Sequence, residues 1–147
     1  MLWWARRAPE NTRARVVASL FLGVGHLALG IAYAVPGWGV VPVLVGTPAQ
    51  VSIVSTIDQY GPYWIIGYLV SGAAVLAAVW SHRLLPTAHL LGSVVVGAFA
   101  FAVWWGTFAS EPNRSLVTGV FVSGWAAWHI ALMLAYTEQL LEAPWKP

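Results

Sequence analysis

The sequence contains no cysteine and few charged residues. The absence of cysteine excludes disulfide frameworks, thiolate metal sites, iron–sulfur clusters and cysteine nucleophiles. Charged residues make up 8% of the 147 positions, whereas a soluble domain carries roughly 25%. So few charges cannot cover the surface of a soluble protein of this size, and 59% of the residues are hydrophobic. The chain is therefore predicted to be an integral membrane protein.

Charge of either sign is also too sparse to define a polar partner or an acid–base site. The formal net charge is +2, which does not indicate a nucleic-acid groove or a channel for acidic substrates. The apolar stretches contain no carboxylate, no serine–histidine–aspartate set and no glycine-rich phosphate loop. We therefore expect a protein that is not an enzyme and binds no nucleic acid. Its expected partners are the lipid bilayer and either further copies of the chain or the subunits of a membrane complex.

Four stretches are apolar over nearly the roughly 20 residues that a helix needs to cross the hydrocarbon core. In order, they are Val16–Val35, Pro62–Trp80, Leu84–Phe108 and Leu116–Tyr136. Helix is the required state, because an open strand would leave backbone groups unpaired in lipid. The predicted fold is an all-α integral membrane protein with four transmembrane helices, forming a single domain over residues 1–147.

The positive residues predict the orientation, because such residues near helix ends remain in the cytoplasm. In this topology Arg114 lies on one side of the membrane. The others lie on the opposite side: Arg6, Arg7, Arg13, Arg15, Arg83 and Lys146. Both termini are therefore predicted to be cytoplasmic, with residues 1–15 forming a basic arm, and the expected location is the bacterial cytoplasmic membrane.

The long connection of residues 36–61 is apolar and is therefore not expected to be a solvated loop. Thr47-Pro48-Ala49-Gln50 has the form of a capping box with proline at the first helical position. The pattern predicts a short helix over Pro48–Ile57. Because about ten residues cannot span the bilayer, this helix is expected to lie in the outer interface.

Tryptophan is the largest compositional excess, with ten residues. Eight of them fall near the predicted membrane faces and are expected to form an aromatic belt: Trp3, Trp4, Trp38, Trp64, Trp80, Trp104, Trp105 and Trp145. Trp125 and Trp128 instead lie inside the fourth helix, three positions apart on one face. They are expected to pack between helices, and a stacking platform for a ligand is the alternative.

His26 and His129 are the candidate cofactor-binding residues of the sequence. They lie on the first and fourth helices, and their predicted depths differ by roughly 4 to 5 Å. Two histidines at matching depth are what a buried b-type haem requires as axial ligands. The alternatives are a hydrogen bond between helices and a proton or ion pathway. In each case the imidazoles are expected to face the bundle interior, since a lipid-facing ring would leave its polar atoms unpaired.

His82 and His89 flank the predicted cytoplasmic turn, beside Arg83. Neither has a thiol or a nearby carboxylate to complete a metal site. Both are expected to be surface histidines at a helix boundary.

Small residues recur along three of the helices at the spacings typical of close-packed membrane helices. They are Gly67, Ser71, Ala74, Ala78, Ser93, Gly97, Ala100, Gly119 and Ser123. Such rows serve packing within one bundle first. They form an interface between copies only where the bundle leaves some of them uncovered.

Several segments together resemble a known family. They are Trp3-Trp4-Ala5-Arg6-Arg7, Gly23 with Gly25 and Gly30, Tyr60-Gly61-Pro62-Tyr63-Trp64, and the tryptophan-rich last helix. In architecture and order, the chain resembles the small four-helix membrane proteins of actinobacterial tailed phages. The resemblance implies a holin-like or lysis-accessory role but carries no functional residue. It departs from holins in that these are often smaller, with fewer helices and a more strongly charged tail.

Three functions remain open at this point. The first is a non-enzymatic, self-associating membrane protein with a holin-like or lysis-accessory role. The second is a b-type haem or quinone-associated subunit that uses His26 and His129 as cofactor-binding residues. The third is a structural subunit of a larger membrane complex.

Overall fold

The computed structural model describes residues 10–35, 57, 61–109 and 116–142 and shows them to be almost entirely helical. The four long helices are α1 (Glu10–Ala34), α3 (Tyr63–Ala78), α4 (Leu85–Ala109) and α5 (Leu116–Glu142). A short 3-10 helix, η1 (His82–Leu84), connects α3 to α4. The prediction of an all-helical fold is confirmed.

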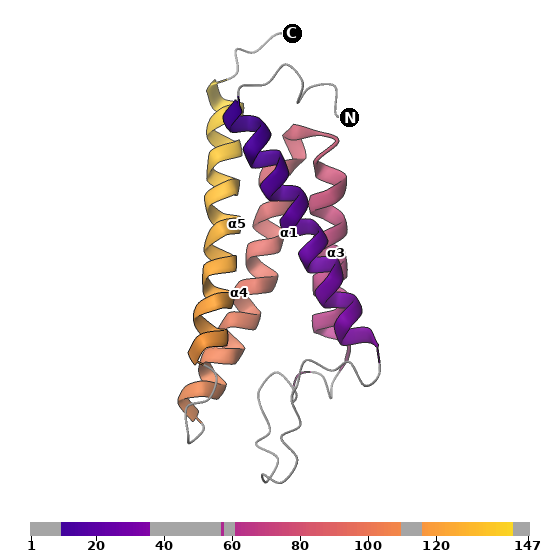
Figure 1. Cartoon of the computed structure of the whole chain (residues 1–147), viewed down its shortest axis with the longest axis vertical. Coiled ribbons are helices and arrows are strands. Elements are labelled where there is room, and N and C mark those ends of the chain that lie inside the picture. The colour runs from indigo at the N-terminus through magenta and orange to yellow at the C-terminus, as the bar shows by residue number, and fades with distance from the viewer. Residues whose placement is uncertain (1–9, 36–56, 58–60, 110–115, 143–147) are drawn as a thin grey trace.

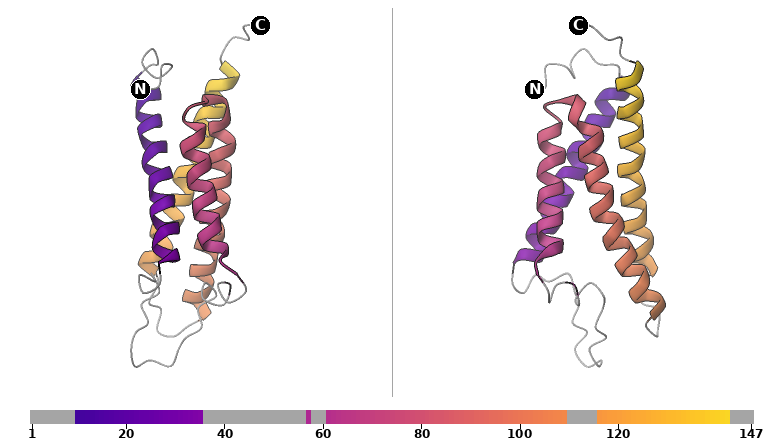
Figure 2. Two further views of the ribbon diagram at one scale, coloured as in Figure 1. Left: turned by 90° about the vertical axis from the view of Figure 1, so that its right-hand side faces the viewer. Right: turned by 180° about the vertical axis from the view of Figure 1, so that it is seen from behind.

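The helices run alternately up and down in an elongated bundle (Figure 1). α1 packs along α3, and α4 packs along α5; we call these the first and the second helix pair. α3 also contacts α4, whereas the backbone of α1 approaches the second pair only slightly. The start of α1 and the end of α5 lie at the same end of the bundle (Figures 1 and 2), here called the terminal end, and the opposite end is called the loop end.

Three of the helical segments are long and apolar enough to cross a membrane: Thr12–Ala34, His82–Gly106 and Thr118–Glu142. The remaining apolar helix, α3, has 16 residues. At a rise of 1.5 Å per residue, such a helix is about 24 Å long, somewhat less than the roughly 30 Å of the hydrocarbon core. The structure thus supplies three candidate spans and one shorter apolar helix.

Helix boundaries agree with the sequence where glycine or proline sets them and extend further where neither is present. α3 begins directly after Pro62, and α4 begins at Leu85, one residue after the expected Leu84. Pro86 lies in the first turn of α4, where its missing N–H would have had no partner. α1 begins at Glu10, six residues early, so residues 10–15 of the expected arm are helical. α5 runs to Glu142, six residues beyond Tyr136, because no helix breaker precedes Pro144.

The predicted interfacial helix Pro48–Ile57 lies outside the described residues apart from Ile57. Ile57 is helical, and it packs against the buried cluster around Trp64 at the loop end.

Close backbone contact in the first pair depends on glycine. A Cβ atom added to Gly72 of α3 would lie 2.9 Å from both the Gly23 carbonyl oxygen and the Leu27 nitrogen of α1. Since both neighbours are backbone atoms, they cannot rotate away. α1 and α3 therefore approach as closely as they do only because residue 72 has no side chain.

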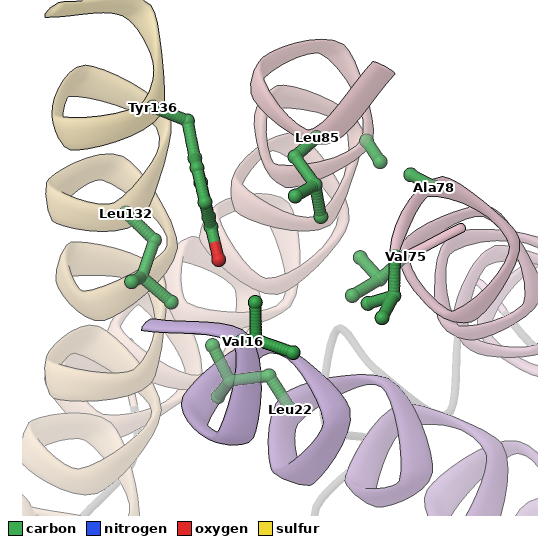
Figure 3. Packing of buried hydrophobic residues seen from close by; sticks show 9 residues of the cluster. Val16, Leu22, Val75, Ala78, Leu85, Leu132 and Tyr136 are labelled. Carbon is green, nitrogen blue, oxygen red and sulfur yellow. The ribbon is translucent and has the colours of Figure 1, made fainter. Parts of the chain in front are cut away.

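The bundle interior contains two apolar clusters. The first includes Val16, Leu22, Leu132 and Tyr136 from α1 and α5, with residues of α3 and α4 on the other side (Figure 3). The second is aromatic and lies toward the loop end; its buried members are Trp64, Tyr68, Val96, Phe99, Ala100, Ala102 and Val122. The buried polar side chains of the candidate site lie in the interior that these clusters enclose.

Candidate functional site: a buried chain of histidines

Three histidines from three different helices meet inside the bundle. His26 of α1, His89 of α4 and His129 of α5 are each 0% exposed. The ring of His129 fits against α4 because residue 92 is glycine, and a Cβ atom at Gly92 would lie 2.6 Å from that ring. The missing side chain of Gly92 thus makes the space in which the central ring lies.

The three rings form a continuous hydrogen-bonded chain. His129 is central: its Nε2 lies 3.0 Å from Nε2 of His26, and its Nδ1 lies 3.0 Å from Nδ1 of His89. Both nitrogens of the central ring are therefore used. Because a neutral imidazole has one donor and one acceptor, His129 donates to one neighbour and accepts from the other.

Each end of the histidine chain is closed by a serine. Oγ of Ser71 on α3 contacts Nδ1 of His26. Oγ of Ser19 on α1 lies 2.8 Å from Nε2 of His89 and 3.1 Å from the hydroxyl of Tyr136. The chain therefore runs Ser71–His26–His129–His89–Ser19–Tyr136 and takes members from all four long helices. We call this set the histidine chain.

Both serine hydroxyls also have a backbone carbonyl to which they can donate. Ser19 Oγ donates to the Arg15 carbonyl oxygen at 2.9 Å, and Ser71 Oγ donates to the Tyr68 carbonyl oxygen at 3.3 Å. Such back-bonding within a helix is usual for serine in apolar surroundings. A serine oxygen whose hydrogen is so directed can only accept from its histidine ring.

Polar side chains continue from the Ser19 end of the histidine chain toward the terminal end. Arg15 donates from Nη1 to the Ala135 carbonyl oxygen at 2.9 Å. Further along, Gln139 donates to the hydroxyl of the buried Thr12 at 3.4 Å. These contacts join α1 to α5 over about two turns beyond Ser19.

The opposite end of the chain borders on aromatic rings. Tyr68 lies one turn from Ser71, stacks on Tyr33 and meets Phe99 edge to face. Trp64 packs against the same Phe99 ring. The histidine chain is thus bordered by polar groups on its terminal side and by aromatic rings on its loop side.

The placement of His26 and His129 confirms the prediction that both face the interior at matching depth. A hydrogen bond between helices, one of the three alternatives, is what the structure shows between them. The prediction for His89 was wrong, because this residue is fully buried, while His82 is exposed as expected. The missed signal is that His89 already lies inside the apolar stretch Leu84–Phe108, where a polar ring needs a buried partner.

The histidine pair as arranged does not fit a haem. Iron lies about 2 Å from an imidazole nitrogen, as zinc does, and a porphyrin needs a slot between its two axial rings. The two Nε2 atoms are instead 3.0 Å apart, with ring centroids 4.8 Å apart. Haem binding therefore stays a prediction that requires the pair to separate. Within the described residues, no group of three or more ligating side chains converges on a point that would hold a metal.

The tryptophans divide differently from the prediction. Trp125 packs against both apolar clusters and meets the His26 ring edge to face, as expected of a residue between helices. Trp128 is 49% exposed, and Trp64, placed in the outer belt, is only 7% exposed. Trp80 is exposed near the terminal end, consistent with a place in the belt. Among the described residues, Trp125 carries the one buried side-chain nitrogen without a hydrogen-bond partner.

Comparison with protein families, with curated proteins and with solved structures finds no match for this chain.

Proposed function

We propose that the protein is a non-enzymatic, self-associating protein of the cytoplasmic membrane with a holin-like or lysis-accessory role. The two helix pairs contact each other directly through α3 and α4, and the histidine chain would hold α1 against the second pair in a closed bundle. Separation of α1 from the second pair would expose inner helix faces to other copies and so allow assembly in the membrane.

The observation that carries this proposal is the way in which α1 meets the second pair. The backbone of α1 lies close to α3 but approaches α4 and α5 only slightly. Side chains make the connection: hydrogen bonds from His26 and Ser19 link α1 to those helices. The first apolar cluster and the bonds of Arg15 and Thr12 add to the contact with α5. Polar bonds between membrane helices are individually weak, averaging about 0.6 kcal/mol. Such a junction can be undone and re-formed without unfolding any helix.

The outer surface supports self-association in the proposed form. Gly97 of α4 and Gly124 of α5 have no atom within 4 Å of an added Cβ. These helices are antiparallel, and Gly92 lies against His129. Gly97 is five residues after Gly92, and Gly124 is five residues before His129. Because the helices are antiparallel, both steps lead toward the loop end, and the two glycines lie at the same depth in the bundle. Each open glycine leaves room for a helix of another copy.

The proposal places all four helices across the membrane with both termini in the cytoplasm. The terminal end carries the start of α1 and the end of α5, which supports termini on one side. Arg13 and Arg15 belong to the same end, which supports a cytoplasmic location for it. α3 would span the hydrocarbon core together with the residues of the turn that follows it, or with local thinning of the bilayer.

Reconstitution into dye-loaded liposomes tests this function. We expect oligomers on chemical cross-linking, and dye release that rises more steeply than in proportion to protein content. Gly124→Leu should reduce both severalfold by filling the open space, whereas Val120→Leu, at a position 62% exposed on the same helix, should change neither. A protein that stays monomeric would contradict self-association, and oligomers that retain the dye would contradict the holin-like role.

A further inference from the structure

The number of hydrogens in the histidine chain does not depend on self-association. Between Ser71 and Ser19 there are four contacts: Ser71–His26, His26–His129, His129–His89 and His89–Ser19. Each contact needs one hydrogen. Three neutral imidazoles supply three N–H groups. One contact therefore needs a hydrogen from another source.

The fourth hydrogen can come from the hydroxyl of Ser71, from that of Ser19, or from an added proton. Ser71 can turn its hydroxyl from the Tyr68 carbonyl oxygen, a long contact of 3.3 Å, to His26. Every N–H of the neutral chain then points from Ser71 toward Ser19. Alternatively, an added proton supplies the hydrogen, and both serines keep their bonds to the Tyr68 and Arg15 carbonyl oxygens.

We propose that the three histidines form a binding site for one excess proton, which the rings share. With that proton bound, each of the four contacts has one hydrogen, and no N–H lacks an acceptor. The hydrogen bonds lower the cost of burying the charge, which would be prohibitive for an unpaired ion. A second proton would bring a fifth hydrogen to four contacts, so one N–H would face another donor. The site therefore takes one proton and excludes a second.

Charged and polar groups around the three rings are distributed unevenly between the two ends of the bundle. The titratable or charged groups near the chain are Arg15 from α1 (whose charge lies near Tyr136), Tyr68 from α3 and Tyr136 itself from α5. From α4 the described residues contribute His89 itself. In the described part of the chain, carboxylates occur only near the terminal end, at the start of α1 and in the last turns of α5. None of these described carboxylates lies beside the rings as a counter-ion. The polar contacts of Ser19 and Tyr136 lie toward the terminal end, whereas aromatic rings line the loop side.

Proton sharing is tested by nitrogen NMR on the histidine-labelled protein, reconstituted at one copy per lipid nanodisc so that self-association plays no part. On lowering the pH from 8 to 4, we expect the signals of His26, His89 and His129 to move together, with uptake of one proton in total. The signals of His82, which is exposed and not part of the histidine chain, serve as the internal reference. Independent uptake of a proton by each buried ring would overturn the proposal, and so would unchanged signals from all three.

A serine pair supplies the matched variants. In the proton-loaded chain, Ser71→Ala removes the acceptor of one N–H. The three histidines should then bind the excess proton at least about tenfold more weakly, because a hydrogen bond to a charged group is lost. Ser93 also donates to a carbonyl three residues earlier, at 2.7 Å, but is not part of the histidine chain. Ser93→Ala should leave proton binding unchanged. Equal effects of the two substitutions would refute the role of the chain ends.

Discussion

Substitution of Ser19 by alanine should loosen the contact between α1 and the second helix pair. The side chain is 0% exposed, and its hydroxyl links α1 to His89 of α4 at 2.8 Å and to Tyr136 of α5 at 3.1 Å. Alanine favours helix and is nearly the same size. The change therefore removes these two bonds between helices and, within α1, the bond to the Arg15 carbonyl oxygen, which does not join α1 to the second pair. At about 0.6 kcal/mol for each bond in a membrane, the loss is about 1.2 kcal/mol. That shifts an equilibrium between closed and open bundles about eightfold.

The sequence has no native cysteine, so a thiol-reactive spin label attaches only to two cysteines introduced for the assay. Val17 of α1 and Leu134 of α5 are suitable positions because they are 64% and 57% exposed. We expect Ser19→Ala to increase the population at the longer label distance about eightfold, and Ser93→Ala to leave the distances unchanged. An unaltered distance distribution in Ser19→Ala, or an equal change in the control, would show that the histidine chain does not hold α1 against the second pair.

Three further outcomes follow from the same structure. Tyr136→Phe removes one of the two Ser19 bonds and should shift the same equilibrium about threefold, while Tyr63→Phe, at an exposed tyrosine, should not shift it. Gly72→Ala should lower the free energy of unfolding in detergent by about 1 to 3 kcal/mol, because the added methyl group meets the backbone of α1. The control Gly97→Ala has open space around the added methyl group and should change that free energy by less than about 0.5 kcal/mol. Reporter fusions after α5 and in the turn between α3 and α4 should report the cytoplasm and a fusion between α4 and α5 the outside, whereas any other pattern would contradict the proposed four-span topology.

The sequence alone determined the helices and the interior placement of two histidines. An apolar stretch of this length has helix as its favoured state in lipid, because no water is present to pair the backbone. α3 and α4 start next to Pro62 and Pro86 because proline lacks an N–H, which has no partner in the first turn of a helix in any surroundings. His26 and His129 had to face inward, since a lipid-facing imidazole leaves its polar atoms unpaired.

Only the tertiary structure decided which side chains meet in the interior. In lipid the outer face of a helix is as apolar as its inner face, so the pattern of apolar residues does not reveal which side is buried. The sequence therefore misplaced Trp64, Trp128 and His89, whose burial depends on how neighbouring helices rotate and slide. Those positions are set by close approach at residues without side chains: Gly72 brings α3 onto α1, and Gly92 admits the ring of His129. The histidine chain exists because these contacts fix the register of four helices at once, which no local pattern in one helix can specify.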